Sequence, residues 1–138
     1  MDVHSCMSED VLVCAPNESI RRAAQCMKEI DAASLPVGEN HRLVGVITDR
    51  DIAVRAVADG KGCDTPVRDV MSSDVQYCFE DEDLGDVAAR MGALQLRRLP
   101  VLDRKKRLVG LVSLSDIVKM ERESGENTLE DIARQSGA

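Results

Sequence analysis

The sequence predicts an α/β (α+β) fold made of two copies of one β-α-β-β-α unit, and two observations support this. Residues 43–52 and residues 108–117 share a pattern that begins with Leu-Val-Gly and ends with Asp-Ile. A Leu-Pro-Val comes shortly before each copy, at residues 35–37 and 99–101. A repeat period this long indicates two copies of one supersecondary unit, so function depends on what the two units make together.

The spacing between equivalent residues is nearly constant. Met7 and Met71 are 64 residues apart, whereas the two Leu-Val-Gly segments are 65 residues apart. The extra residue falls in polar, turn-like stretches, residues 38–42 and 103–107, where loops absorb changes of length. The flanking strands are therefore expected to stay intact.

The first copy is expected to contain a short strand, an amphipathic helix, two strands around a polar turn and a second helix. These elements cover residues 11–14, 19–30, 35–37, 42–47 and 49–58. Apolar residues recur at three- and four-residue spacing along the first helix, and Ser19 is suited to be its N-cap. A polar turn separates the two strands, as in a hairpin.

The second copy repeats this order over residues 75–79, 83–94, 99–102, 108–112 and 115–122. We assign residues 1–60 to the first copy, 61–66 to a connector rich in turn formers, and 67–124 to the second copy. Residues 125–138 form a tail with no counterpart in the first copy. A short helix at residues 128–134 would serve as a dimer contact, and a frayed tail is the alternative.

Composition narrows the class of function. The chain of 138 residues has the size of one domain, so two repeats that share an aliphatic core are favoured over two separately folded domains. A net charge of -7 argues against nucleic-acid binding, which normally needs a basic face. No signal peptide and no apolar run of membrane-spanning length is present, so we expect a cytoplasmic protein without a membrane partner.

The five cysteines are odd in number, which fits a reducing compartment. Cys14 and Cys78 occupy equivalent positions in the two copies. We interpret them as buried small hydrophobic residues rather than as a redox pair.

A hydroxyl residue followed three places later by an aspartate stands at the end of the third strand of each copy. These pairs are Thr48 with Asp51 and Ser113 with Asp116. The hydroxyl can cap the helix that follows, whose free N–H groups suit a phosphate, and the carboxylate could accept two hydrogen bonds from a ribose diol. The alternative is a capping box, in which the aspartate only satisfies backbone donors.

Taken together, these motifs resemble the CBS domain, a small regulatory module named after cystathionine β-synthase, in a tandem pair. The resemblance covers about residues 5–122 and includes a Met-Ser at residues 7–8 and 71–72, before each first strand. It implies two repeats packed through their sheets with approximate twofold symmetry. It also implies two clefts that accept adenosine-containing ligands, each drawing on both repeats.

Carried onto this chain, the resemblance assigns residues to each cleft. The first cleft would use Leu111, Ser113, Asp116, Asp10, Leu12, Ala32 and Ala33. The second cleft would use Val46, Thr48, Asp51, Asp74, Gln76, Leu96 and Arg97.

The two clefts are not expected to be equal. Arg50, Arg97 and Arg98 could converge on the second cleft, whereas Lys119 is the nearest obvious cation of the first. Because guanidinium groups bind phosphate through charge-assisted hydrogen bonds, we expect the second cleft to bind an adenine nucleotide more tightly. The alternative for Arg97 and Arg98 is a solvated charge pair beside a strand.

Other candidate sites have less support. His4 and His41 lack partners at metal-ligand spacing and are expected on the surface. The acidic run at residues 80–83 precedes a helix, where negative charge complements the helix dipole, so we interpret it as a solvated helix start rather than a cation site.

The favoured function is a non-catalytic regulatory module that senses an adenosine-containing ligand. AMP, ADP and ATP are the first candidates for this regulatory ligand, with NAD and S-adenosylmethionine as further ones, and no cofactor is required. By resemblance we expect a homodimer that acts on an unidentified regulated protein. The alternative is a structural dimerisation or protein-interaction module with empty clefts. An enzyme has the least support, because no nucleophile or general base stands near the expected clefts.

Overall fold

The computed structural model describes residues 1–124, and its contacts divide the chain into two compact units. We call Leu12–Val75 the first unit. Within the described residues, the second unit consists of Met1–Val11 together with residues 76–124. The copies in the sequence and the compact units are therefore different divisions of the chain.

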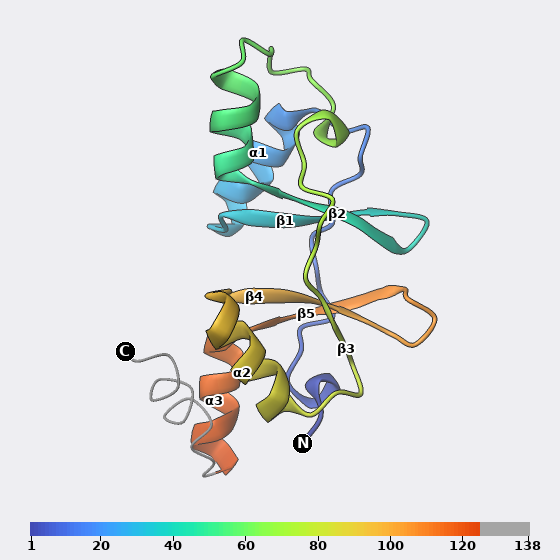
Figure 1. Cartoon of the computed structure of the whole chain (residues 1–138), viewed down its shortest axis with the longest axis vertical. Coiled ribbons are helices and arrows are strands. Elements are labelled where there is room, and N and C mark those ends of the chain that lie inside the picture. Colours follow the sequence, from blue (N-terminus) through green and yellow to red (C-terminus); the bar gives the residue numbers. More distant parts are fainter. Residues whose placement is uncertain (125–138) are drawn as a thin grey trace. The chain divides into compact units, whose positions relative to one another are not determined.

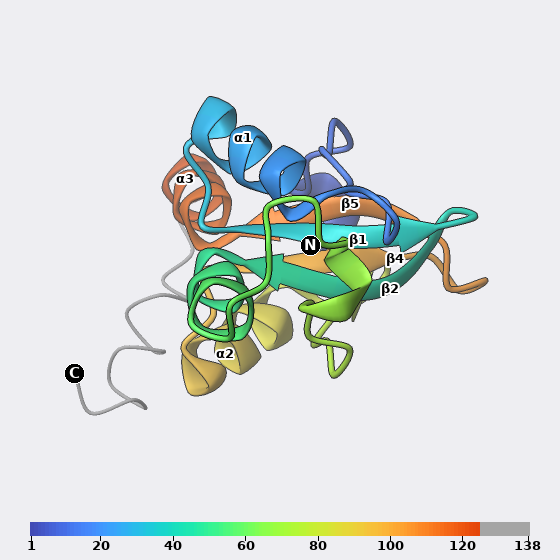
Figure 2. The same cartoon turned by 90° about the horizontal axis from the view of Figure 1, so that it is seen from above.

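The first unit is a β-hairpin covered by helices. Its elements are α1 (Ile20–Ile30), β1 (Ser34–Glu39), β2 (Arg42–Thr48), η2 (Asp51–Val57) and η3 (Val67–Asp69). Both α1 and η2 lie on the same face of the hairpin (Figure 1). Figure 2 looks down on that face, with α1 over the β1 side and η2 over the β2 side.

Helix α1 begins and ends where the sequence predicts. The Ser19 hydroxyl accepts a hydrogen bond from the Arg22 N–H, and Asp31 ends the helix in the left-handed conformation with φ of 53°. The apolar face of α1 is buried against the hairpin, in a core closed by η2 and by the segment around η3. Its fully or nearly fully buried members include Ala23, Leu35, Val37, Ile47, Ala56, Val67 and Val70.

The second unit has the same kind of hairpin plus one more strand. Its elements are η1 (Val3–Ser5), β3 (Cys78–Phe79), α2 (Leu84–Leu94), β4 (Arg98–Leu102), β5 (Leu108–Ser113) and α3 (Leu114–Ser124). Strand β3 is parallel to β4, which is antiparallel to β5. The predicted helix at residues 128–134 lies outside the described residues.

The first strand of each copy is shorter in the structure than the sequence predicts. Residues 11–13 are not a strand, and only Cys14 forms a bridge, to Val37. In the second unit, only Cys78 and Phe79 of the predicted strand 75–79 pair with β4. The Cys14 N–H donates to the Pro36 carbonyl oxygen and the Gly38 N–H donates to the Cys14 carbonyl oxygen. The next bond of this ladder toward residue 12 would need an N–H on Pro36, which proline lacks.

The second helix of the first unit differs from expectation in type. The predicted helix at residues 49–58 is present, but its hydrogen bonds over Asp51–Val57 are of the π type. The Arg55 guanidinium donates to the carbonyl oxygens of Val70, at 3.3 Å, and Met71, at 3.0 Å. These bonds fix η2 against the segment that leads out of the unit.

The two Met-Ser segments pair with the Leu-Val-Gly strands. Ser8 exchanges backbone hydrogen bonds with Leu111 of β5, and Ser72 does the same with Val46 of β2. Gly110 and Gly45 make this approach possible, since a Cβ atom at either position would lie under 3.0 Å from the serine carbonyl oxygen. The repeated glycine therefore has a packing reason at both positions.

Candidate functional site

Each unit carries one hydroxyl–aspartate motif at the junction between a strand and a helix. In the first unit, β2 ends at Thr48 and the π-helix η2 begins at Asp51. In the second unit, β5 ends at Ser113 and α3 begins at Leu114. We call these two junctions the Asp51 half-site and the Asp116 half-site.

The carboxylate of the Asp51 half-site is occupied by the protein itself. The Asp51 N–H donates to the Thr48 hydroxyl at 2.9 Å, and the Thr48 N–H donates to the Asp51 carboxylate at 3.0 Å. The Ser72 hydroxyl lies 3.4 and 3.5 Å from the two carboxylate oxygens. Asp51 is only 9% exposed, so the capping-box interpretation describes this aspartate well.

The Asp116 half-site keeps only half of this arrangement. The Asp116 N–H donates to the Ser113 hydroxyl at 3.1 Å, and the Ser113 and Ser115 hydroxyls lie 3.0 Å apart. Within residues 1–124, no donor bonds to the Asp116 carboxylate, which is half-buried. This carboxylate therefore retains its full capacity to accept hydrogen bonds.

The segment that pairs beside each half-site accounts for part of this difference. Ser72, beside Val46, points its hydroxyl at Asp51, whereas the side chain of its counterpart Ser8 makes no hydrogen bond within the described chain. Burial, followed by the negative charge of Asp116, raises the pKa of the Cys6 thiol. Sequence reasoning missed Ser72, although the repeated Met-Ser was a signal that could have found it.

The predicted cleft residues divide between the two units. The first unit contains Val46, Thr48, Arg50, Asp51 and Asp74, and also Leu12, Ala32 and Ala33. The second unit contains Leu111, Ser113, Asp116 and Asp10, and also Gln76, Leu96, Arg97 and Arg98. Asp74 thus belongs to the same unit as the Asp51 half-site and Asp10 to the same unit as the Asp116 half-site, and the composition of each cleft stays a prediction.

Backbone hydrogen bonds join two of the predicted cleft residues, Ala33 and Arg97, to the strand–helix junction of their own unit. The Asp49 N–H donates to the Ala33 carbonyl oxygen, and the Leu114 N–H donates to the Arg97 carbonyl oxygen, both at 2.9 Å. Each bond joins the strand that starts the hairpin to the helix that follows it. Ala33 is thereby fixed beside the Asp51 half-site, and Arg97 beside the Asp116 half-site.

Several cations near the half-sites are available to an anionic group. Arg50, Arg97 and Arg98 are exposed, and none of them forms an ion pair within the described part of the chain. Lys119 follows Asp116 on α3 and, with Ser115 and Arg122, lines a shallow hollow along that helix. Both half-sites therefore have cations in their own unit.

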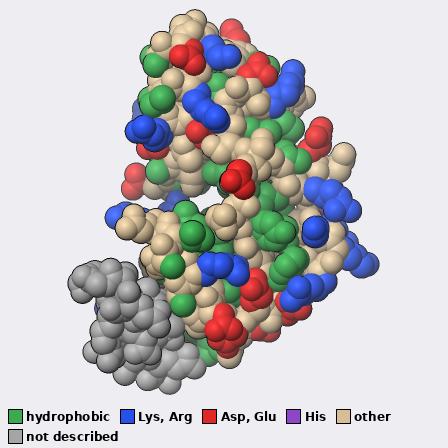
Figure 3. Space-filling view, in the orientation of Figure 1, with side chains coloured by type: hydrophobic (Ala, Val, Ile, Leu, Met, Phe, Trp, Pro, Cys, Tyr) green, Lys and Arg blue, Asp and Glu red, His purple; other side chains and the backbone are tan. Residues whose placement is uncertain are grey.

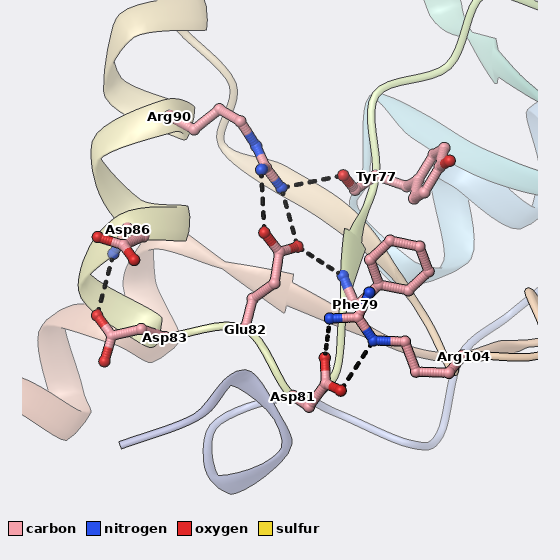
Figure 4. Close-up of polar contacts among 8 residues, drawn as sticks. All are labelled: Tyr77, Phe79, Asp81, Glu82, Asp83, Asp86, Arg90 and Arg104. Atoms are coloured by element: carbon pink, nitrogen blue, oxygen red, sulfur yellow. Dashed lines mark hydrogen bonds and ion pairs between the residues drawn. The ribbon is translucent and has the colours of Figure 1, made fainter.

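The side chains of the acidic run at residues 80–83 make contacts within the second unit (Figure 4). Asp83 caps α2 by accepting from the Asp86 N–H, as its place before a helix predicts. Glu82 accepts from the Phe79 N–H at 2.8 Å and from both terminal nitrogens of Arg90. Asp83 and Glu82 thus make more hydrogen bonds and ion pairs than the predicted solvated helix start would. Among residues 1–124, no group of three or more His, Cys, Asp or Glu side chains is placed to hold a metal ion.

A cluster of basic side chains marks the turn between β4 and β5 (Figure 3). Arg104 pairs with Asp81 at 2.7 Å and lies 4.2 Å from the centre of the Phe79 ring. Arg107 donates to Asp103 at 2.7 Å, which closes the turn. These contacts give the charges of Arg104 and Arg107 a structural role.

The remaining candidates are consistent with surface or core positions. His4 and His41 are both exposed, and His4 lies 3.5 Å from Glu80. All five cysteines are free thiols, and burial raises the pKa of both Cys14 and Cys78 to about 12. No helix among the described residues has the length and apolar character needed to cross a membrane.

Comparison with known proteins supports the resemblance seen in the sequence. The model of the CBS domain family matches residues 2–57 and 67–123. The CBS domain-containing protein YhcV of Bacillus subtilis is 38% identical over 136 residues, which cover 97% of this chain and 96% of that protein.

Two solved structures extend this comparison to the fold. Hypoxic Response Protein I, solved with two coordinated zinc ions, is 30% identical with a TM-score of 0.76, over 86% of this chain and 98% of that one. The CBS domain pair of protein MJ0100, in complex with 5′-methylthioadenosine and S-adenosyl-L-methionine, is 29% identical with a TM-score of 0.74. The match covers 90% of this chain and 98% of that pair.

Proposed function

Because the chain belongs to the CBS domain family, with CBS domains at residues 2–57 and 67–123, we propose that it is a non-catalytic module that senses an adenosine-containing ligand. One observation carries the proposal. A hydroxyl and a carboxylate stand at the start of a helix in both units, in the order Thr48 with Asp51 and Ser113 with Asp116. The candidate ligands are AMP, ADP, ATP, NAD and S-adenosylmethionine.

The chemistry of these half-sites fits such a ligand. The N-terminus of a helix presents free N–H groups and a positive dipole end, which suit a phosphate or a carboxylate group. A carboxylate can accept a hydrogen bond from each hydroxyl of a ribose diol. The complex of the MJ0100 pair with two adenosyl compounds supports the same ligand class here.

Regulation requires that ligand affinity differ between two states of the protein. We propose that the protein acts as a homodimer and that ligand binding changes how this dimer binds its regulated partner. The exposed apolar side chains of Val54 and Val57 on η2, 46% and 68% exposed, support an interaction surface there. Light scattering of the wild type and of Val57→Lys tests the dimer, since a lysine at a buried interface would favour monomers.

A thermal-shift screen tests the proposed ligand class. AMP, ADP, ATP, NAD, S-adenosylmethionine and 5′-methylthioadenosine are added separately, and guanosine monophosphate serves as the control. A ligand that binds only the native state stabilises it by about 2.7 kcal/mol at a hundred times its Kd, so the melting temperature rises. No shift with any adenosyl compound would favour the structural dimerisation module instead.

A further inference from the structure

We propose that Met7 and Met71 are oxidation sites, at which hydrogen peroxide loosens the two Met-Ser segments from the Leu-Val-Gly strands. Such a response to an oxidant goes beyond ligand sensing and does not depend on it. It follows from the contact that each methionine makes with a glycine of the neighbouring strand. Both contacts lie within a single unit, Met7 with Gly110 in the second and Met71 with Gly45 in the first.

Each methionine sulfur occupies space that a side chain on the neighbouring strand would otherwise fill. A Cβ atom at Gly110 would lie 2.7 Å from the Met7 sulfur, and a Cβ atom at Gly45 would lie 2.7 Å from the Met71 sulfur. The carbonyl oxygen of the following serine lies within 2.9 Å of the same position in both units. Because such contacts are close-packed, an oxygen atom added to either sulfur competes with the strand for this space.

Exposure separates these two methionines from those in the cores. Met7 and Met71 are half-buried, whereas Met27 is 7% exposed and Met91 is fully buried. A small oxidant therefore reaches Met7 and Met71 without unfolding of the core, while Met27 and Met91 react only after the structure opens.

Most of the thiols compete poorly for the same oxidant. Peroxide reacts with the thiolate, and burial raises the pKa of Cys6 and raises the pKa of Cys14 and Cys78 to about 12. A thioether has no proton to lose, so its oxidation does not need such an ionisation. Cys26 is only 5% exposed, and the exposed Cys63 is the thiol that an experiment has to remove.

The chemical step is the transfer of one oxygen atom from peroxide to sulfur. A lone pair of the thioether attacks one peroxide oxygen, the O–O bond breaks, an S–O bond forms, and the other oxygen leaves as water after a proton transfer. The sulfur loses two electrons and the peroxide gains them. The resulting sulfoxide is larger and polar, so it no longer suits the apolar contact with the glycine.

The loosened segment carries the serine that pairs with the strand. In the first unit, Ser72 exchanges backbone hydrogen bonds with Val46, and its hydroxyl lies 3.4 and 3.5 Å from the Asp51 carboxylate oxygens. Oxidation of Met71 therefore also changes the surroundings of the Asp51 half-site. In the second unit, the residue after Met7 pairs with β5 in the same way.

Peroxide treatment of Cys63→Ser, followed by peptide mass spectrometry, tests the accessibility of the two sites. Sulfoxide should form at Met7 and Met71 about tenfold faster or more than at Met27 and Met91, because the core methionines react only through opened states. Equal rates at all four methionines would overturn the proposal.

Amide exchange measured by NMR shows whether the sulfoxides loosen the segments. The N–H groups of Val46 and Leu111 donate to the serine carbonyl oxygens, both at 2.9 Å. Their exchange should accelerate by about tenfold or more after oxidation, because these hydrogen bonds open more often. Methionine sulfoxide reductases should restore the slow exchange, since they return the sulfoxide to the thioether. Unchanged exchange in protein that carries both sulfoxides would contradict the proposal.

Two further variants, made in the Cys63→Ser protein, identify the responsible methionines. Met7→Leu combined with Met71→Leu keeps a similar volume and cannot be oxidised, so peroxide should no longer accelerate the exchange. Met120→Leu is the matched control and should keep the response, because Met120 is half-buried but is not among the nearest neighbours of a Cβ at either glycine.

The outcomes of these experiments are distinguishable from a failure of the proposed function. A response that persists in the double variant, or that is lost in Met120→Leu, would overturn the assignment to Met7 and Met71. If the double variant does not fold, reversal by the reductases in the Cys63→Ser protein decides the same point, and acceleration that they do not reverse counts against methionine oxidation. No adenosyl compound is present in any of these measurements, so either result leaves the proposed ligand class untouched.

Discussion

Ser8 and Leu111 exchange two backbone hydrogen bonds, of 2.8 and 2.9 Å, although one stands near the start of the sequence and the other in its last third. Val46 and Ser72 form the matching pair in the first unit, with both bonds at 2.9 Å. Each Leu-Val-Gly strand thus pairs with the first residues of the other copy. The first residues of the chain are therefore a structural part of the second unit.

This relationship predicts the effect of Val3→Ala. Val3 is fully buried in the core of the second unit, so the substitution should lower the free energy of unfolding by about 2 kcal/mol. Hydrogen exchange followed by mass spectrometry should show faster exchange in α2 while α1 changes little. Val13→Ala, at a position 39% exposed, is the control and should have a small effect. Equal acceleration in α1 would contradict the assignment of Val3 to the second unit.

The same pairing predicts that Gly110 cannot be enlarged. A Cβ atom at this position would lie 2.8 Å from the Ser8 carbonyl oxygen and 2.7 Å from the Met7 sulfur. Since the carbonyl belongs to the backbone, Gly110→Ala must displace the segment and should destabilise the protein by about 1–3 kcal/mol in denaturant unfolding.

Gly62→Ala is the matched control for Gly110→Ala. No atom lies within 4 Å of a Cβ built at Gly62, so alanine there should be neutral or stabilise by about 0.4–1 kcal/mol. If both variants unfold at the same denaturant concentration, the close approach of Ser8 to β5 is not what fixes the glycine.

Local features of the sequence predicted most elements of the fold. Helix α1 could be found from its apolar spacing and its Ser19 cap, because both signals lie within the helix and its first turn. The two hairpins followed from short apolar strands around polar turns. The family resemblance then supplied the tandem pair of CBS domains, which the comparisons confirm.

Features that depend on contacts distant in the sequence could not be predicted. Nothing in residues 1–11 shows that they pack with β5 and α2, because this pairing joins residues about a hundred positions apart. The two motifs share the hydroxyl and the aspartate but differ in the residues between them, and only the Asp51 motif forms the reciprocal bond. Ser72 and Ser8 are the same residue type at matching positions, yet only the Ser72 hydroxyl is directed at its aspartate, which the sequence alone does not show.

The environments of the cysteines predict their reactivity. Burial raises the pKa of Cys78 to about 12, and burial together with the Glu18 carboxylate does the same for Cys14. Because the thiolate is the nucleophile, iodoacetamide at pH 8 should modify the exposed Cys63 first and leave Cys14 and Cys78 protected. Peptide mass spectrometry measures each site.

Two controls complete the cysteine experiment. Labelling in 8 M urea should modify all five thiols at similar rates, because the protecting structure is lost. Cys63→Ser should remove the fast phase in the native protein. Modification of Cys14 or Cys78 as fast as that of Cys63 before unfolding would show that these thiols are not buried as described.

Glu82 links the acid stability of the second unit to its pairing with Arg90. Burial opposes the charged form of Glu82, but the hydrogen bonds from Arg90 and from the Phe79 N–H outweigh it and hold its pKa below the usual value. A carboxylate with a lowered pKa in the folded state stabilises the protein above its unfolded pKa, near 4.5, and loses this contribution as the pH falls through the folded value.

Glu82→Gln should therefore destabilise the protein at pH 7 and flatten the fall in stability below about pH 5. We expect a loss of about 1.5–3 kcal/mol at pH 7, the range for hydrogen bonds to a charged group, from denaturant unfolding repeated between pH 7 and pH 3. Glu29→Gln is the matched control, since Glu29 is 63% exposed and lies 3.8 Å from Arg22. Exposed pairs of this kind contribute about 0–1 kcal/mol, so its curve should follow the wild type. If the free energy of unfolding falls equally below pH 5 in the two variants, the acid sensitivity of the fold arises from carboxylates other than Glu82.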